Sequence, residues 1–196
     1  MKRHLVILSA CHCTALFIAC LFALFSTAPV YAVGETIVNT TTLANDASDG
    51  KCSLREALQA AFTQKTEGKA SVTYNECKVF AGPTTITFAG DAAAGILTLT
   101  PSDAPLPMII KEVILMGPVT IRGSGPQPAN AQFKDTRLFW MQEGGVLTLM
   151  NLTLQNGYTT GAGGAIFSYS SNTTINLIGV SIVDNTAENN GGGCER

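Results

Sequence analysis

The sequence is poor in charge and has no excess of basic residues. Charged side chains make up 13% of its 196 residues, and 12 Lys and Arg stand against 14 Asp and Glu, for a net charge of -2. Proteins that bind the phosphates of nucleic acid need a basic surface, so the composition argues against a nucleic-acid-binding protein. Apolar residues reach 46%, which also excludes a wholly disordered chain.

Histidine is nearly absent. The chain has only His4 and His12, and both lie in the N-terminal segment that ends at Ala32. If that segment is removed on export, no mature histidine is left for a Ser-His or Cys-His pair or for a His-metal site.

The segment from Met1 to Ala32 has the features of an export signal. Lys2 and Arg3 precede an apolar run at 15–25, and the Val-Tyr-Ala sequence at 30–32 supplies small residues at a cleavage site. The apolar run of 11 residues is short for a membrane span of about 20. We therefore expect cleavage after Ala32, in preference to a retained anchor or to lipidation at Cys20. Removing 32 of the 196 residues leaves 164, and losing two basic residues takes the net charge from -2 to -4.

Cysteine is sparse once the leader is removed. Three of the six cysteines belong to the leader, and the three that remain are Cys52, Cys77 and Cys194. Their spacing resembles no metal site, because there is no C-x-x-C and no histidine to complete one. In an oxidising exterior we expect a disulfide between Cys52 and Cys77. It would close a loop of 26 residues, worth roughly 3–4 kcal/mol from chain entropy, and would leave Cys194 unpaired.

One helix is predicted, from residue 54 to 63. Ser53 and Glu56 form an S-x-x-E capping box, in which each side chain satisfies a backbone amide at the start of a helix. Apolar residues recur behind it at helical spacing. Gly68 argues against a much longer helix.

Elsewhere the pattern has period 2 and predicts short strands separated by Gly, Pro, Asp or Asn. The runs are 35–43, 85–88, 96–100, 113–116 and 119–121.

An internal repeat follows these strands. Residues 147–154 match 175–182 without a gap at an interval of 28, with apolar residues at the same places. Beyond them Asn156 falls on Asp184, and the pair Gly163 and Gly164 falls on Gly191 and Gly192. A looser copy at 113–125 matches at an interval of 33, with an adjustment upstream.

A repeat of this length, built from short strands and glycine turns, predicts a parallel β-solenoid with one coil per repeat. The two strands of each copy follow one another without the turn residues that a hairpin needs, whereas a bend between two faces of a coil fits. We expect Asn151, Asn156, Asp184 and Asn185 to lie at bends and the paired glycines to form corners. The alternative is an antiparallel sandwich, which also has short alternating strands.

Residues 52–57, Cys-Ser-Leu-Arg-Glu-Ala, resemble the CSLREA segment near the start of many secreted bacterial β-helix proteins. The Gly-Gly-Ala-Ile sequence at 163–166 is similar to the GGA repeat motif of polymorphic outer membrane proteins, and 182–185 resembles their F-x-x-N motif with Ile in place of Phe. The resemblance covers most of 35–196. It implies a right-handed parallel β-helix outside the cell or on its surface, usually without known enzymatic activity. The second glycine copy departs from the motif, since Gly193 and Cys194 follow Gly192.

These observations predict an all-β protein: a right-handed parallel β-helix with one N-terminal capping α-helix. The expected parts are a signal peptide at 1–32, a cap with the CSLREA helix at 33–83, and the coils of an incomplete β-helix at 84–196. The helix would cover the open end of the solenoid, where unpaired backbone and apolar core are exposed. Arg55 and Glu56 are then structural.

The expected function is structural or adhesive, at the cell surface or in the exterior, or at the outer membrane if an anchor follows in a longer chain. We expect no catalytic residue, metal or cofactor. Surface glycans and other cell-surface proteins are the candidate partners, while nucleic acid and a membrane span of the mature chain are not expected. The alternative is a carbohydrate-active β-helix enzyme, a lyase or hydrolase, or a fragment of one. A passenger fragment of a larger autotransporter-like adhesin is a third interpretation.

Three groups of residues could carry other chemistry, and each has a simpler structural interpretation. Asp46 and Asp49 could offer oxygen ligands to Ca²⁺, but a polar turn explains them without a complete calcium loop. Asp184 and Glu188 are the nearest approach to a glycosidase acid pair, and a solvated loop accounts for both. Five aromatic residues could stack on sugars, although packing is their commoner role: Phe139, Trp140, Tyr158, Phe167 and Tyr169.

Overall fold

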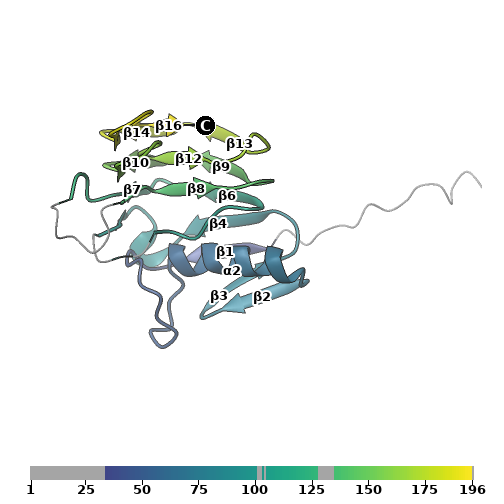
Figure 1. The fold of residues 1–196 in the computed structure, drawn as a ribbon. Coiled ribbons are helices and arrows are strands. Elements are labelled where there is room, and N and C mark those ends of the chain that lie inside the picture. The colour runs from purple at the N-terminus through teal and green to yellow at the C-terminus, as the bar shows by residue number, and fades with distance from the viewer. Residues whose placement is uncertain (1–33, 101–102, 104, 128–134, 196) are drawn as a thin grey trace, which may run out of the picture. The chain divides into compact units, whose positions relative to one another are not determined.

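The computed structural model describes residues 34–100, 103, 105–127 and 135–195. The expected signal peptide at 1–32 lies outside these residues. The described chain is mostly β-structure with a single α-helix (Figure 1).

Most strands belong to parallel sheets (Figure 1). The largest sheet has the order β1 (Glu35–Val38), β4 (Thr84–Phe88), β6 (Glu112–Met116), β9 (Val146–Met150) and β13 (Thr174–Ile178). The second has the order β14 (Ser181–Val183), β10 (Thr153–Gln155), β7 (Thr120–Arg122) and β5 (Ile96–Thr98). The third has the order β16 (Cys194–Glu195), β12 (Ile166–Ser168) and β8 (Phe139–Met141). The fourth pairs β11 (Tyr158–Thr159) with β15 (Thr186–Ala187).

The chain visits these four sheets in the same order twice. Strands β9 to β12 enter the first, second, fourth and third sheets in turn, and β13 to β16 repeat that course one position further along each sheet. Every pairing between the two passes is parallel and joins residues 28 positions apart, as in Leu147 with Ile175, Leu154 with Ile182 and Ile166 with Cys194. The pairing expected between 147–154 and 175–182 is therefore present. An antiparallel sandwich is wrong for these strands.

The looser copy of the repeat at 113–125 also pairs in parallel with the next copy, at a longer interval. Thr120 pairs with Thr153, 33 positions on, and Val113 pairs with Leu147, 34 positions on. The difference of one residue is the upstream adjustment that the sequence required. It is taken up in the bend between β6 and β7.

Alternation along the strands builds the core. In β9 and β10 the side chains of Leu147, Leu149 and Leu154 are fully buried, while their neighbours within the two strands are only partly buried. The bends between strands use left-handed backbone at matched places. Asn151 and Gly179, which occupy equivalent positions in the two copies of the repeat, have φ of 56° and 63°. Asn and Gly are the residues that adopt this conformation at least cost, so local sequence and stacking agree.

Helix α2 runs from Leu54 to Glu67, so the predicted end at residue 63 is wrong by a full turn. Gly68 is the residue that ends it, with a left-handed φ of 63° that caps the helix. The residues of the last turn of α2 are polar, but contacts with the rest of the protein keep this turn helical. Gln64 is buried and donates a hydrogen bond to the carbonyl of Lys69 at 2.7 Å.

Two further elements shape the cap. An antiparallel hairpin of β2 (Ser71–Tyr74) and β3 (Cys77–Phe80), absent from the sequence prediction, packs against α2, as does β1 (Figure 1). A short 3-10 turn, η1 (Gly90–Ala92), lies between β4 and β5. The predicted strand at 35–43 ends at Val38, because Asn39 turns the chain toward the cap. The backbone amide of Asn39 donates a hydrogen bond to the Cys52 carbonyl, and the side-chain oxygen of Asn39 accepts one from the backbone amide of Cys52.

Candidate functional site

The start of α2 is held by the Ser53 and Glu56 capping box. Ser53 Oγ accepts a hydrogen bond from the Glu56 amide at 3.2 Å, and Glu56 Oε2 accepts one from the Ser53 amide at 2.9 Å. Glu56 is 1% exposed, and its other oxygen accepts hydrogen bonds from the Asp46 amide and the Asn75 side chain. The carboxylate thus ties three parts of the cap together, a structural role.

Cys52 and Cys77 are joined by a disulfide, with an S–S distance of 1.94 Å. Both side chains are buried, and the bond fixes the residue before the helix cap to the first residue of β3. Cys194 on β16 is a free, exposed thiol.

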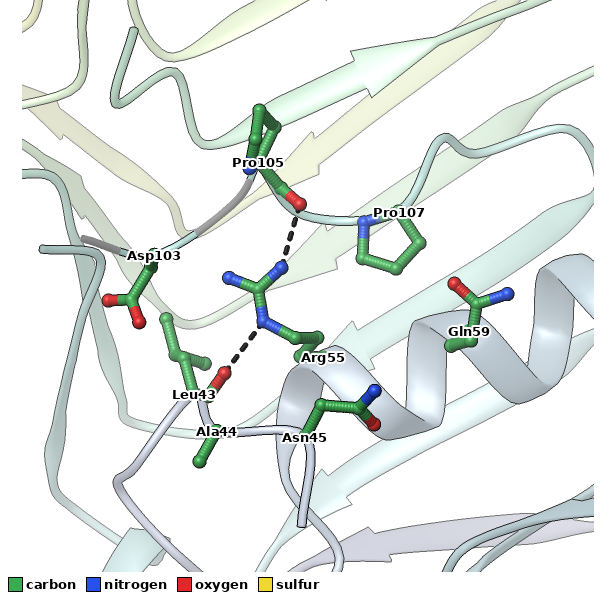
Figure 2. Close-up of a pocket in the computed structure, with 8 residues that line it drawn as sticks. All are labelled: Leu43, Ala44, Asn45, Arg55, Gln59, Asp103, Pro105 and Pro107. Carbon is green, nitrogen blue, oxygen red and sulfur yellow. Dashed lines mark hydrogen bonds between the residues drawn. The ribbon is translucent and has the colours of Figure 1, made fainter. Parts of the chain in front are cut away.

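Arg55 lines a hollow of about 410 Å³ between the cap and the chain around Pro105 (Figure 2). Its Nε donates a hydrogen bond to the Leu43 carbonyl, and another guanidinium nitrogen donates one to the Pro105 carbonyl, both at 2.7 Å. Asp103, also in this hollow, accepts hydrogen bonds from the amide and hydroxyl of Thr100. The charged groups of the hollow therefore fasten loops of the protein to one another.

Lys111 is a buried cation that the sequence did not single out as a site. It is 7% exposed, and its Nζ donates hydrogen bonds to Gln64 Oε1 at 2.6 Å and to the Phe80 carbonyl at 3.2 Å. Burial, and secondarily the charge of Lys65, lowers the Lys111 pKa to about 8. Both acceptors are neutral, so this ammonium group links α2 and β3 to the residue before β6 without an acidic partner in these two contacts.

We expect Lys111 to make stability rise with pH above about 8. In the folded protein its pKa is about 8, below the ordinary 10.5, so between these pH values the unfolded chain binds more protons and the free energy of unfolding increases. Urea denaturation of Lys111→Met and the parent, both carrying Cys194→Ser to prevent thiol exchange, measures the effect. The parent should gain roughly 1–3 kcal/mol over the variant between pH 7.5 and 10.5.

Lys69→Met is the matched control for this measurement. Lys69 has a side chain 63% exposed and forms an ion pair with Glu67 at the helix end. Its difference from the parent should stay constant over the same pH range. Parallel curves for Lys111→Met and Lys69→Met would show that the Lys111 ammonium group is not desolvated.

The four predicted corner glycines have two different roles. Gly163 and Gly191 adopt left-handed φ values of 69° and 60°. Gly164 and Gly192 lie too close to neighbouring backbone for a side chain. Hydrogen bonds from Gly163 to the Asn190 carbonyl and from Gly164 to the Gly191 carbonyl join the two copies.

Asn185 bridges adjacent layers at the bend between β14 and β15. Its Oδ1 accepts a hydrogen bond from the Gly157 amide at 2.7 Å, and its Nδ2 donates to the Leu154 carbonyl at 3.0 Å. Asn156 and Asp184 both have φ of 54°, which places them at bends as expected. The Asn185 side chain thus satisfies backbone groups of the adjacent layer.

The five aromatic residues divide into two groups. Phe139 and Tyr158 are buried, and the Tyr158 hydroxyl donates a hydrogen bond to Glu188. The other three face outward beside Arg137 on the sheet of β8 and β12. We call this group the aromatic strip: Arg137, Trp140, Phe167 and Tyr169.

The rings of the aromatic strip meet edge to face. Trp140 pairs with Phe167 across β8 and β12, their ring centroids are 6.2 Å apart, and Phe167 lies 6.5 Å from Tyr169. The Arg137 guanidinium lies over the first two rings, 5.4 Å from the Trp140 centroid and 4.7 Å from that of Phe167. Trp140 is 36% exposed and Tyr169 75%. The strip is thus an ordered aromatic surface open to solvent.

Arg137 is fixed from its other side by polar contacts. Its side chain is 11% exposed, and it forms an ion pair with Asp135 at 3.2 Å and donates a hydrogen bond to Thr159 Oγ1 at 2.8 Å. Burial lowers the Arg137 pKa, and the negative charge of Asp135 opposes that shift. The guanidinium group therefore holds the rings in place with its charge already paired.

An apolar hollow of about 280 Å³ adjoins Trp140. Its walls come from α2, from the chain around Pro105 and from β8, and it is lined by Gln59, Phe62, Pro105, Leu106, Pro107, Met108 and Trp140. Trp140 thus belongs both to the aromatic strip and to this hollow. Alternation within Phe-Trp-Met points the flanking residues of β8 inward and Trp140 outward.

The acids considered for chemistry have turn-forming contacts. Asp46 Oδ1 accepts hydrogen bonds from the amide and hydroxyl of Ser48, which lower the Asp46 pKa, and Asp49 accepts one from the Lys51 amide. Glu188 accepts a hydrogen bond from the Tyr158 hydroxyl, and Asp184 lies at a bend with a left-handed φ. Within the described residues, no group of three His, Cys, Asp or Glu side chains is arranged to hold a metal ion.

No helix in the described part of the chain has the length and apolar character needed to cross a membrane. Comparison of the chain with protein-family models, curated proteins and solved structures found no match.

Proposed function

We propose that this chain is an exported, right-handed parallel β-helix protein with a structural or adhesive role outside the cell or on its surface. The single observation that carries the proposal is the repeated course of the chain through four parallel sheets at one constant interval. Each pass is then one coil, and right-handed crossovers are the rule for parallel strands. The signal-like leader and the CSLREA-like cap support export.

The cap supports a stacked architecture because it covers one end of the sheets. Helix α2 and the β2–β3 hairpin pack at the N-terminal side, and the Cys52–Cys77 disulfide joins them. Solenoids need such an end to stay soluble. In an oxidising exterior, where such a disulfide persists, this cap is a durable end piece.

An adhesive role is supported by where the outward-facing residues lie. The described residues place the aromatic strip on one sheet, while Arg55, Glu56 and Asp103 make contacts within the protein. Exposed aromatic surface beside an apolar hollow is typical of binding. The carbohydrate-active enzyme stays an alternative for experiment to decide.

Surface binding and polysaccharide cleavage, measured on the same protein, separate these functions. The full chain would be expressed with its leader in an export-competent bacterium, and the exported protein purified. We expect it to bind immobilised polysaccharides or cell-surface proteins in biolayer interferometry without releasing reducing ends or unsaturated sugars. Release of either product would replace the adhesive role by the enzymatic one. If the protein bound none of the polysaccharides or cell-surface proteins tested, the adhesive role would be contradicted.

A further inference from the structure

We propose that the aromatic strip and the adjoining hollow form a binding site for an uncharged polysaccharide, with Trp140 at its centre. This inference rests on the proposed adhesive function and names the class of ligand. Its starting point is that Trp140 and Tyr169 are exposed and Phe167, which contacts both rings, is partly buried, whereas the residues beside Trp140 in β8 and beside Phe167 in β12 point into the core.

The strip is organised before any ligand arrives. Arg137 lies over the rings of Trp140 and Phe167, and Asp135 and Thr159 hold Arg137. Rings fixed in this way lose little conformational freedom when a ligand stacks on them, which raises affinity. Aromatic rings combine a large apolar face with low entropy cost, and they suit the C–H faces of pyranose rings.

The charge pattern favours an uncharged ligand. Arg137 is the cation of the strip, and its charge is paired with Asp135 at 3.2 Å while its side chain is 11% exposed. Within the part of the chain that the structure describes, a carboxylate or sulfate on the ligand would therefore meet only a guanidinium group of the strip that is already paired. It would also have to approach Asp135, whose side chain is 43% exposed. Asp135 and Gln59, beside the rings and the hollow, are instead suited to hydrogen bonds with hydroxyl groups.

The size of the hollow favours a polymer lying on the surface. At about 280 Å³ it is at the lower limit of pockets that enclose a small molecule. It can accept one sugar unit or a substituent beside Trp140, while neighbouring units extend along the strip over Phe167 and Tyr169. The ligand thus runs across strands that are paired in register.

Trp140 provides a direct readout, because it is the only tryptophan in the chain. The exported full-length protein would be titrated with cellohexaose, chitohexaose and mannohexaose, and with polygalacturonate and dextran sulfate as charged comparators. We expect a saturable change in tryptophan emission with at least one neutral probe. Calorimetry should give the same affinity.

Variants assign the binding to the strip. Trp140→Ala should weaken calorimetric binding at least tenfold. Tyr169→Ala, at a site 75% exposed where we expect truncation to leave the fold intact, should weaken it about three- to tenfold. Met116→Ala is the matched control, because Met116 is 38% exposed on the outer face of a different sheet. It should bind like the parent.

The possible results separate this inference from the adhesive function. A neutral probe whose binding is insensitive to both Trp140→Ala and Tyr169→Ala would overturn the site while leaving adhesion intact. Preference for a charged polymer, or binding to cell-surface protein with no neutral sugar bound, would overturn the ligand class and leave adhesion intact. Failure to bind any sugar, protein or cell surface would overturn both proposals.

Discussion

Gly164→Ala is expected to lower the free energy of unfolding by about 3 kcal/mol. A Cβ at this position would lie 2.5 Å from the Thr186 carbonyl oxygen and 2.6 Å from that of Gly192. Both atoms are backbone of the next layer, so a side-chain rotation cannot relieve the contact. The layers would have to separate at this corner and weaken the hydrogen bond from the Gly164 amide to Gly191.

Gly161→Ala, three residues earlier in the same loop, is the control for Gly164→Ala. Its Cβ would have nearest neighbours at 3.5 and 3.6 Å, which is ordinary contact. The variant should stay within about 0.5 kcal/mol of the parent. Urea denaturation followed by circular dichroism measures both. Equal stability of the two variants would show that the layers are not packed as closely at this corner as described.

Loss of the Cys52–Cys77 disulfide should cost roughly 3–4 kcal/mol. The bond closes a loop that includes all of α2 and the β2 strand, and opening it frees this loop in the unfolded chain. Because both cysteines are buried, the double variant Cys52→Ala with Cys77→Ala avoids placing new hydroxyl groups in the core. Guanidinium denaturation under non-reducing conditions gives the free energy.

Two comparisons isolate the effect of the disulfide. Reduction of the parent with a phosphine should bring its stability close to that of the double variant. Cys194→Ser should leave stability unchanged, since Cys194 is a free, exposed thiol. A loss below about 1 kcal/mol in the double variant would mean that the cap keeps its structure through packing alone.

Features set by neighbouring residues were predictable from the sequence. The capping box lies within four residues, and Ser53 and Glu56 form it as drawn from the S-x-x-E pattern. The partners of β9 and β10 followed from a gap-free repeat, because an identical spacing in both copies permits only one register. The end of α2 was missed because the last turn of the helix is polar, and because Gln64, which is buried in that turn, has its partner Lys111 47 residues further along the chain.

The remaining features depend on contacts that no local pattern records. The β2–β3 hairpin turns at Asn75 and Glu76 without the Asn-Gly signature, and β2 shows little burial contrast. The aromatic candidates could be named from the sequence but not divided into core and surface. Alternation along β8 does not decide by itself whether Phe139 or Trp140 faces the core, because that depends on how the strand is paired in its sheet.

The constant interval between the last two passes has a consequence for how such a chain changes over generations. Each pairing between β9–β12 and β13–β16 joins residues 28 apart, so an in-frame duplication of 84 bases would add a whole layer while preserving every neighbour relationship already present. An insertion that is not a multiple of 28 codons would have to be taken up in a loop, as at the earlier intervals of 33 and 34, or would break a corner. Length in this architecture therefore varies in discrete increments, and a gene can extend the reach of the protein without redesigning its interior.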